Sequence, residues 1–362
     1  MNKAHFILGD GVYPYVTGGM EIFNYYLIKR LSKHFLISYS SYKKLDITNT
    51  NFHKCLKIKP VKIFFPIQIF IYLLFHRDIK TVVVSYSASS WIIWLIYYIT
   101  FKILKQNYIV VIHYGKKPET NHKYVYRNFF KSAKKVVSVS YDIKNNYDKL
   151  FNIDSAVIFP LVPFEHCTIT KKDLRLKYNI PINRTVICMI GSIKGMKNPD
   201  TILKCLQKFH LSELQQFNPH VVYAGDGNMV SMLKNFANTY HLENRVTFLG
   251  VVPKEHINEI YKLSDIYLIA SDFEGTSVSL LEAMFNKIPI IASRVPGIIH
   301  TITEGIECLM FQVHNHNELK KCVLDLMNSP DLAYKIAAQA YNHYKDDYNY
   351  DCILEKYTKL LS

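Results

Sequence analysis

Short apolar runs alternate along the whole chain with longer segments of helical periodicity. Runs such as VVYAG (221–225) and IYLIAS (266–271) are short, continuous and β-branched, as in parallel strands covered on both faces. In the first half, strands are expected near 4–9, 35–40, 81–85, 108–113 and 136–140, and helices near 19–34, 90–105 and 121–134. In the second half, strands are expected near 185–191, 219–224, 246–249, 266–270 and 289–292, and helices near 198–209, 228–241, 254–263, 276–286 and 316–328. This alternation predicts an α/β fold with two doubly wound, Rossmann-like sheets in succession.

The length of 362 residues suits two such domains. Three prolines among polar residues mark 160–184 as the linker. We therefore expect one domain over 1–165 and a second over 166–344, with a C-terminal helix at about 345–362 that packs back on the first. Such folds bind ligands at the carboxyl ends of their strands, so two facing sheets would place a site in the cleft between them.

The net charge of +15 is concentrated in the first domain. Residues 1–165 contain 23 Lys and Arg against 9 Asp and Glu, whereas 166–362 contain 21 against 20. A basic domain of this kind attracts nucleic acid, an anionic membrane or an anionic substrate. The seven cysteines and 15 histidines show no metal-ligand spacing, so we expect neither a disulfide framework nor a metal site. The first residues lack a signal-peptide pattern, which favours a cytoplasmic chain.

Two apolar stretches, 63–75 and 91–101, are shorter than the roughly 20 residues that a membrane-spanning helix needs. They predict buried helices or helices that lie on a membrane. Residues 121–135 place lysines and an arginine on one side of a helix and apolar residues on the other. This pattern fits an ordinary helix with a solvated basic face, and it equally fits a membrane-surface helix.

The segment 264–297 contains the strongest candidate chemistry. A buried strand leads into a polar loop with Glu274, and a helix that begins near Thr276 carries Glu282 about 7 Å further along its axis. Between them, the N–H groups of three residues would form an anion-binding helix N-terminus: Gly275, Thr276 and Ser277. A nucleoside diphosphate sugar needs the same order of groups, because carboxylates bind the hydroxyls of its sugar and ribose on either side of the diphosphate. Alternatively, both carboxylates only stabilise the helix N-terminus.

This pattern resembles the retaining GT-B glycosyltransferases of family four, which are known for a Glu-x7-Glu motif in this setting. The matching residues are Glu274-Gly275, Leu281-Glu282-Ala283-Met284, Pro289 with IIAS, and Pro296-Gly297. The resemblance runs from about residue 185 to 325. It implies two Rossmann-like domains that face each other across a cleft, the first for the acceptor and the second for the donor. It also implies that Glu274 contacts the donor sugar and that Glu282 binds the ribose hydroxyls.

The segment VICMIGSIKGMKNPDTIL (186–203) resembles the diphosphate loop of that family. Lys197 matches its phosphate-binding lysine, but Ser192 stands where an arginine is usual. Lys194 is a candidate substitute, as a point charge without the fork of arginine. On its own, Lys197 would be interpreted as a solvated loop lysine. The turn AGDGNM (224–229) resembles another family segment, and we interpret it as structural.

Two segments of the first half also match, more thinly. Gly18 and Gly19 fit a Gly-Gly-x-Glu loop that touches the donor phosphate at a helix N-terminus. His113 ends the strand YIVVIH (108–113), where the family often has a histidine beside the transferred sugar. Without the resemblance, we would interpret His113 as a surface histidine or one with satisfied hydrogen bonds.

We therefore expect a metal-independent glycosyltransferase that needs no cofactor and uses a nucleoside diphosphate sugar as donor substrate. A glycan or lipid-linked acceptor, in surface polysaccharide or lipopolysaccharide assembly, would suit the basic domain and its apolar stretches. The chain would lie peripherally on the inner face of the membrane. Two alternatives remain, a sugar-nucleotide epimerase on the same fold and a basic nucleic-acid-binding protein without catalysis. No nucleic-acid recognition motif is present in the sequence, so no nucleic-acid partner is expected.

Overall fold

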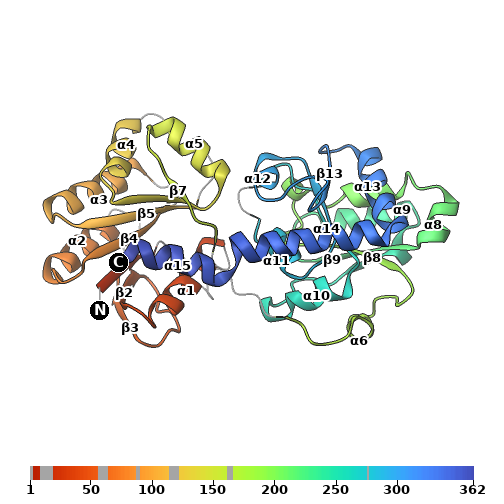
Figure 1. Ribbon diagram of the computed structural model, residues 1–362, viewed down its shortest axis with the longest axis horizontal. Helices are drawn as coiled ribbons and strands as arrows, with labels where there is room; N and C mark the ends of the chain where they lie inside the picture. Colours follow the sequence, from red (N-terminus) through yellow and green to blue (C-terminus); the bar gives the residue numbers. More distant parts are fainter. Residues whose placement is uncertain are drawn as a thin grey trace. The chain divides into compact units, whose positions relative to one another are not determined.

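The computed structural model describes residues 3–8, 19–55, 64–86, 90–113, 122–160, 166–274 and 277–362. The chain forms two compact units (Figure 1). Unit 1 combines Met1–Pro163 with Asn349–Ser362, and unit 2 is Phe164–Tyr348. Each has its own parallel sheet and its own core, which confirms the α/β class expected from the alternation of strands and helices.

Unit 1 contains a seven-stranded parallel sheet in the order β3-β2-β1-β4-β5-β6-β7. Its strands are β1 (Lys3–Ile7), β2 (Leu36–Ser41), β3 (Thr50–Lys54), β4 (Thr81–Tyr86), β5 (Asn107–Ile112), β6 (Lys135–Ser138) and β7 (Ala156–Val157). Its helices are α1 (Gly19–Leu31), α2 (Phe64–Phe75), α3 (Trp91–Ile103), α4 (Lys123–Lys131), α5 (Tyr141–Phe151) and α15 (Tyr350–Leu361). Because crossovers between parallel strands are right-handed, α1 lies on one face of the sheet and α2 to α5 lie on the other.

The last helix of the chain, α15, packs on α1 within unit 1 (Figure 1). The rings of Phe23 and Tyr357 lie 5.6 Å apart, and the guanidinium of Arg30 lies over the ring of Tyr350 at 5.4 Å. The two ends of the sequence thus share one core.

Unit 2 contains a six-stranded parallel sheet in the order β10-β9-β8-β11-β12-β13. Its strands are β8 (Thr185–Ile190), β9 (Pro219–Ala224), β10 (Val246–Phe248), β11 (Ile266–Ile269), β12 (Ile290–Ser293) and β13 (Leu309–Phe311). Its α-helices are α6 (Lys171–Lys177), α7 (Thr201–Leu206), α8 (Leu211–Phe217), α9 (Val230–Thr239), α10 (Ile257–Leu263), α11 (Val278–Phe285), α12 (Pro296–Ile299), α13 (His316–Asn328) and α14 (Pro330–His343). The strand order reverses direction between β8 and β11, and such a switch point is where doubly wound sheets bind ligands.

Some elements were not expected from the sequence. Strands β3, β7 and β13 are short or polar and lack the continuous apolar pattern of the central strands. The stretch interpreted as a linker contains α6, whose N-cap Thr170 accepts a hydrogen bond from the N–H of Asp173. In the described part of the chain, we find no helix with the length and apolarity that crossing a bilayer requires.

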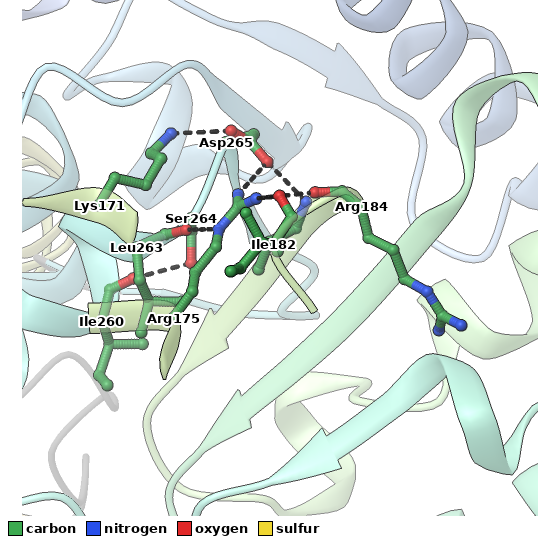
Figure 2. Close-up of polar contacts among 9 residues, drawn as sticks. Lys171, Arg175, Ile182, Arg184, Ile260, Leu263, Ser264 and Asp265 are labelled. Atoms are coloured by element: carbon green, nitrogen blue, oxygen red, sulfur yellow. Dashed lines mark hydrogen bonds and ion pairs between the residues drawn. The ribbon is translucent and has the colours of Figure 1, made fainter. Parts of the chain in front are cut away.

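Helix α6 is joined to the sheet of unit 2 by Arg175, whose side chain is only 6% exposed. Its guanidinium donates to the carbonyl oxygens of Leu263 at 2.9 Å, Ile182 at 2.8 Å and Arg184 at 3.0 Å (Figure 2). It also donates to the carboxylate of Asp265 at 2.6 Å. One buried side chain therefore satisfies three backbone carbonyls that would otherwise lack a donor.

Asp265 connects this cluster to the amino ends of the two central strands. Its Oδ2 accepts from the N–H of Val186 in β8 at 2.7 Å, and it directly precedes β11. Its Oδ1 pairs with Lys171 at 2.8 Å (Figure 2). These contacts hold β8 and β11 together at their amino ends.

Replacing Arg175 with Ala should lower the free energy of unfolding of unit 2 by about 2 kcal/mol, because it removes the donor to three backbone carbonyls, while Asp265 keeps Lys171 and the N–H of Val186. Lys171→Ala is the matched control, since this lysine binds the same carboxylate but is 45% exposed, and it should cost less than about 1 kcal/mol. Urea unfolding followed by circular dichroism measures both. Equal stability of the two variants would contradict this account of the cluster.

Candidate functional site

A pocket lies at the carboxyl ends of β8 and β11, the two strands at the switch point of unit 2. The loop after β8 contributes Gly191, Ser192 and Lys197 to its lining, and the loop after β11 contributes Ser271 and Glu274. Ser279 of α11 lines the pocket as well. Two of the residues expected from the sequence, Lys197 and Glu274, are thus brought together from loops that are 77 residues apart in the chain.

The loop after β8 rests directly on the turn after β9. A Cβ atom on Gly225 would lie 1.8 Å from the carbonyl oxygen of Gly191, and one on Gly227 would lie 2.2 Å from that of Ile193. Two backbone hydrogen bonds join the loop and the turn, from Ile193 N–H to Asp226 O at 2.9 Å and from Met229 N–H to Ile193 O at 3.2 Å. Glycine is required at both positions because only it allows this approach of the two backbones.

Lys197 and Glu274 form an ion pair, with Nζ and Oε1 2.5 Å apart. The hydroxyl of Ser271 donates to the same oxygen at 2.6 Å. The Glu274 side chain is 8% exposed, whereas that of Lys197 is 37% exposed. The carboxylate is therefore held inside the pocket wall, and its cation reaches solvent.

Asn198 fastens the two loops together, and sequence reasoning did not identify it. Its backbone is left-handed, with φ +44°, and its buried amide nitrogen donates to Ala270 O at 3.1 Å and to Asp272 Oδ1 at 2.5 Å. The N–H of Asp272 in turn donates to Met196 O at 3.0 Å. Asparagine tolerates this conformation better than other side chains, which is the signal that could have marked the position.

Glu282 lies in α11 with its side chain 7% exposed. Burial raises the pKa of its carboxyl group, while the ammonium of Lys254 at 3.7 Å and the hydroxyl of Tyr261 at 3.0 Å oppose that shift. The helix begins after Ser277, whose hydroxyl accepts from the N–H of Leu280 at 3.3 Å. Gly275 and Thr276, the other residues expected at this helix N-terminus, lie outside the described residues.

Lys194, the candidate substitute for the missing arginine, is exposed. It is not among the described residues that line the pocket, whereas Ser192 is.

In unit 1, Gly18 lies outside the described residues and Gly19 is the first residue of α1. His113 directly follows β5, and burial lowers the pKa of its imidazole to about 3, so the ring is neutral. Its ring lies 4.9 Å from that of Phe23, and among the described residues its buried Nε2 has no hydrogen-bond partner. The interpretation as a histidine with satisfied hydrogen bonds is therefore not supported by the described part of unit 1.

Among the described residues, no three His, Cys, Asp or Glu side chains lie together in a way that could hold a metal ion.

Residues 170–343 match the family described as Glycosyl transferases group 1. An uncharacterized glycosyltransferase of Methanocaldococcus jannaschii is 26% identical over 234 residues, which cover 64% of this chain and 59% of that relative. The solved structure of Anabaena Alr3699/HepE in complex with UDP superimposes with a TM-score of 0.81 at 14% identity, over 100% of this chain and 99% of that one. The lipopolysaccharide outer core galactosyltransferase WaaB gives a TM-score of 0.71 at 16% identity, over 99% of both chains. The chain has the GT-B fold, and its matched residues support a glycosyltransferase enzyme.

Proposed function

We propose that the chain transfers a sugar, with retention of its anomeric configuration, from a nucleoside diphosphate sugar to a glycan or lipid-linked acceptor. The proposal rests on one observation above all. Lys197 and Glu274 line the pocket at the switch point of a domain that matches the group 1 glycosyltransferases, and Glu282 lies in α11, the helix after the loop of Glu274.

The donor would lie along the carboxyl ends of β8 and β11. The side chain of Lys197 is 37% exposed, whereas that of its partner Glu274 is 8% exposed. The ammonium can therefore bind a diphosphate while it remains near Glu274. A positive group preorganised beside the leaving diphosphate lowers the barrier to transfer, because charge develops there in the transition state. Glu274 would bind the sugar hydroxyls and Glu282 the ribose. HepE, which shares the fold, was solved in complex with UDP, and this supports a nucleotide sugar as donor.

The remaining expected contacts belong to backbone groups and to unit 1. The N–H groups of Gly275, Thr276 and Ser277 would bind the diphosphate at the start of α11, and Gly18 and Gly19 would do the same at the start of α1. His113 would contact the transferred sugar through its neutral ring, whose buried Nε2 has no hydrogen-bond partner among the described residues.

Glu282→Gln should weaken donor binding about tenfold, and Glu274→Gln should lower turnover at least about tenfold, because its contact is beside the reacting sugar. Lys197→Ala should reduce both. Calorimetry with nucleotide sugars measures binding, and acceptor-dependent release of nucleoside diphosphate measures turnover. Lys204→Ala is the control, as this lysine pairs with Asp200 on the solvent side at 2.6 Å.

Full activity in all three folded variants would contradict the assignment. Conversion of the nucleotide sugar to an isomer without acceptor would instead favour an epimerase.

We expect transfer to need no divalent metal, because Lys197 and helix N-termini can neutralise the diphosphate. Activity should be unchanged within about twofold in excess EDTA, since the cation that stabilises the diphosphate would be a side chain. Loss of activity in EDTA that magnesium or manganese restores would refute this prediction.

The surface of unit 1 would bind the membrane that carries the acceptor. Helix α2 exposes five large apolar side chains, and the neighbouring α3 exposes two more: Phe64, Ile67, Ile71, Leu74, Phe75, Ile99 and Ile103. We call this set the α2–α3 ridge. Arg77 joins the ends of the two helices by donating to Leu104 O at 3.0 Å, and exposed Lys80, Lys102 and Lys105 follow in the same region. An apolar ridge with a basic end suits an anionic membrane that carries a lipid-linked acceptor, as lipopolysaccharide assembly requires.

Helix α4 would bind the membrane through its charged side chains and would not insert into it. Its apolar residues Tyr126, Phe129 and Phe130 are buried in unit 1, as in an ordinary helix on a sheet. Its basic face, which includes Arg127 and Lys131, remains available to lipid headgroups.

The protein should bind vesicles with anionic lipid and detach as salt rises, since each Lys or Arg near the surface contributes about 1 kcal/mol and salt screens this attraction. Changing Ile67, Ile71, Leu74 and Phe75 to Ser should weaken binding because shallow insertion is lost. Changing Arg127, Lys131, Lys134 and Lys135 to Gln should reduce the salt dependence. Liposome co-sedimentation measures both, and equal binding to neutral and anionic vesicles would refute the proposal.

A further inference from the structure

Glu282 is a buried carboxylate in the middle of α11, where ionisation is costly unless a counter-ion lies close. The role proposed for it requires the ionised form. A carboxylate can accept hydrogen bonds from two ribose hydroxyls, whereas a protonated carboxyl group converts one of its oxygens into a donor.

The counter-ion comes from a different part of unit 2. Lys254 begins a 3₁₀ turn (Lys254–His256) after β10, and its Nζ lies 3.7 Å from Oε1 of Glu282. This separation is an ion pair but exceeds hydrogen-bond length, so the lone pairs of Oε1 stay available to a hydroxyl. The Lys254 side chain is itself mostly buried, at 23% exposed.

The second oxygen of Glu282 is held by a tyrosine. Tyr261 of α10 is buried, and Oε2 at 3.0 Å and Ser279 O at 2.8 Å share the single proton that its hydroxyl can donate. Tyr267 of β11 donates to the Ser279 hydroxyl at 2.8 Å. Lys254 and Tyr261 together restrict the carboxylate from both sides, one through charge and the other through a directed hydrogen bond.

We propose that Lys254 is a positioning residue of the donor site, which keeps Glu282 ionised and oriented to accept the ribose hydroxyls of a nucleoside diphosphate. The inference rests on the proposed function. It adds a residue outside the Glu-x7-Glu segment and the diphosphate loop, contributed by the connection between β10 and α10.

The two tyrosines and the cysteine near Glu282 are uncharged near neutral pH. Burial raises the pKa values of Tyr261 and Tyr267 well above their usual range. Cys188 of β8, which lies near both tyrosines, has its pKa raised to about 12 by burial. Glu274, which acts on Tyr267, is already paired with Lys197. The terminal phosphate of a nucleoside diphosphate also titrates at about pH 6, and it does so with every variant. A pH dependence between about pH 6 and pH 8.5 that appears in Lys254→Met with the ribonucleotide, but not with its dideoxy analogue, would therefore report Glu282.

The test compares wild type, Lys254→Met and Lys254→Arg by calorimetry. The probe is whichever of UDP, GDP and ADP the wild type binds most tightly, together with its 2′,3′-dideoxy analogue. Without Lys254, the pKa of Glu282 should rise, so Lys254→Met should bind the ribonucleotide about tenfold more weakly near pH 6 and recover affinity toward pH 8.5. In the wild type, the ribonucleotide and the dideoxy analogue should show the same pH dependence, since only their shared phosphate titrates. The dideoxy analogue should bind wild type and Lys254→Met within about twofold, and Lys254→Arg should retain most affinity because it restores the charge.

Lys177→Met provides a matched control, because Lys177 pairs with another buried carboxylate of unit 2, Glu259, at 2.6 Å. It should leave nucleotide affinity unchanged at every pH. If Lys254→Met showed the same affinity and pH dependence as the wild type, the inference would be wrong, but the proposed function would stand. A loss that is equal for both nucleotides and at every pH would also overturn it, since it would indicate a merely structural role. If the wild type binds none of the three nucleotides, the proposed function fails and the inference fails with it.

Discussion

The need to neutralise carboxylates at the two ends of β8 and β11 constrains how unit 2 is assembled. Three carboxylates adjoin its two central strands, the buried Glu274 and Glu282 and the partly exposed Asp265. Each has a cation from a distant part of the sequence: Asp265 with Arg175, Glu274 with Lys197, and Glu282 with Lys254. A carboxylate taken out of water without such a partner costs several kcal/mol. The three pairs therefore tie α6, the loop after β8 and the turn after β10 to the sheet around β8 and β11.

The pairs differ in what they leave available for a ligand. At the amino ends of the strands, Arg175 makes bonds to three carbonyls as well as to Asp265, so its donors are used within the protein. At the carboxyl ends, Lys197 is 37% exposed and Lys254 stands 3.7 Å from its partner. The first arrangement is suited to stability, and the second leaves hydrogen-bonding capacity on the side of the sheet where ligands bind.

The sequence predicted the central strands well, because short, continuous, β-branched runs such as those of β9 and β11 are typical of parallel strands that are buried on both faces. It missed β3, whose residues TNFHK show no apolar run, and α6, whose linker-like setting concealed a helix held by one buried arginine. Lys197 was identified because it belongs to a local motif. Asn198 and Lys254 were not, because their roles arise from contacts with residues far along the chain, and a single sequence contains no record of those contacts.

The pairing of Lys197 with Glu274 bears on how a donor would enter the proposed site. Nζ lies 2.5 Å from Oε1, so a diphosphate that attracts the ammonium must share it with the carboxylate or draw it away. Glu274 would keep the hydroxyl of Ser271, at 2.6 Å, but one neutral donor cannot replace a full charge. Hydroxyls of the donor sugar could supply the missing hydrogen bonds to Glu274. A nucleoside diphosphate without its sugar would leave that carboxylate less well satisfied, and the site would then favour the complete donor over the product.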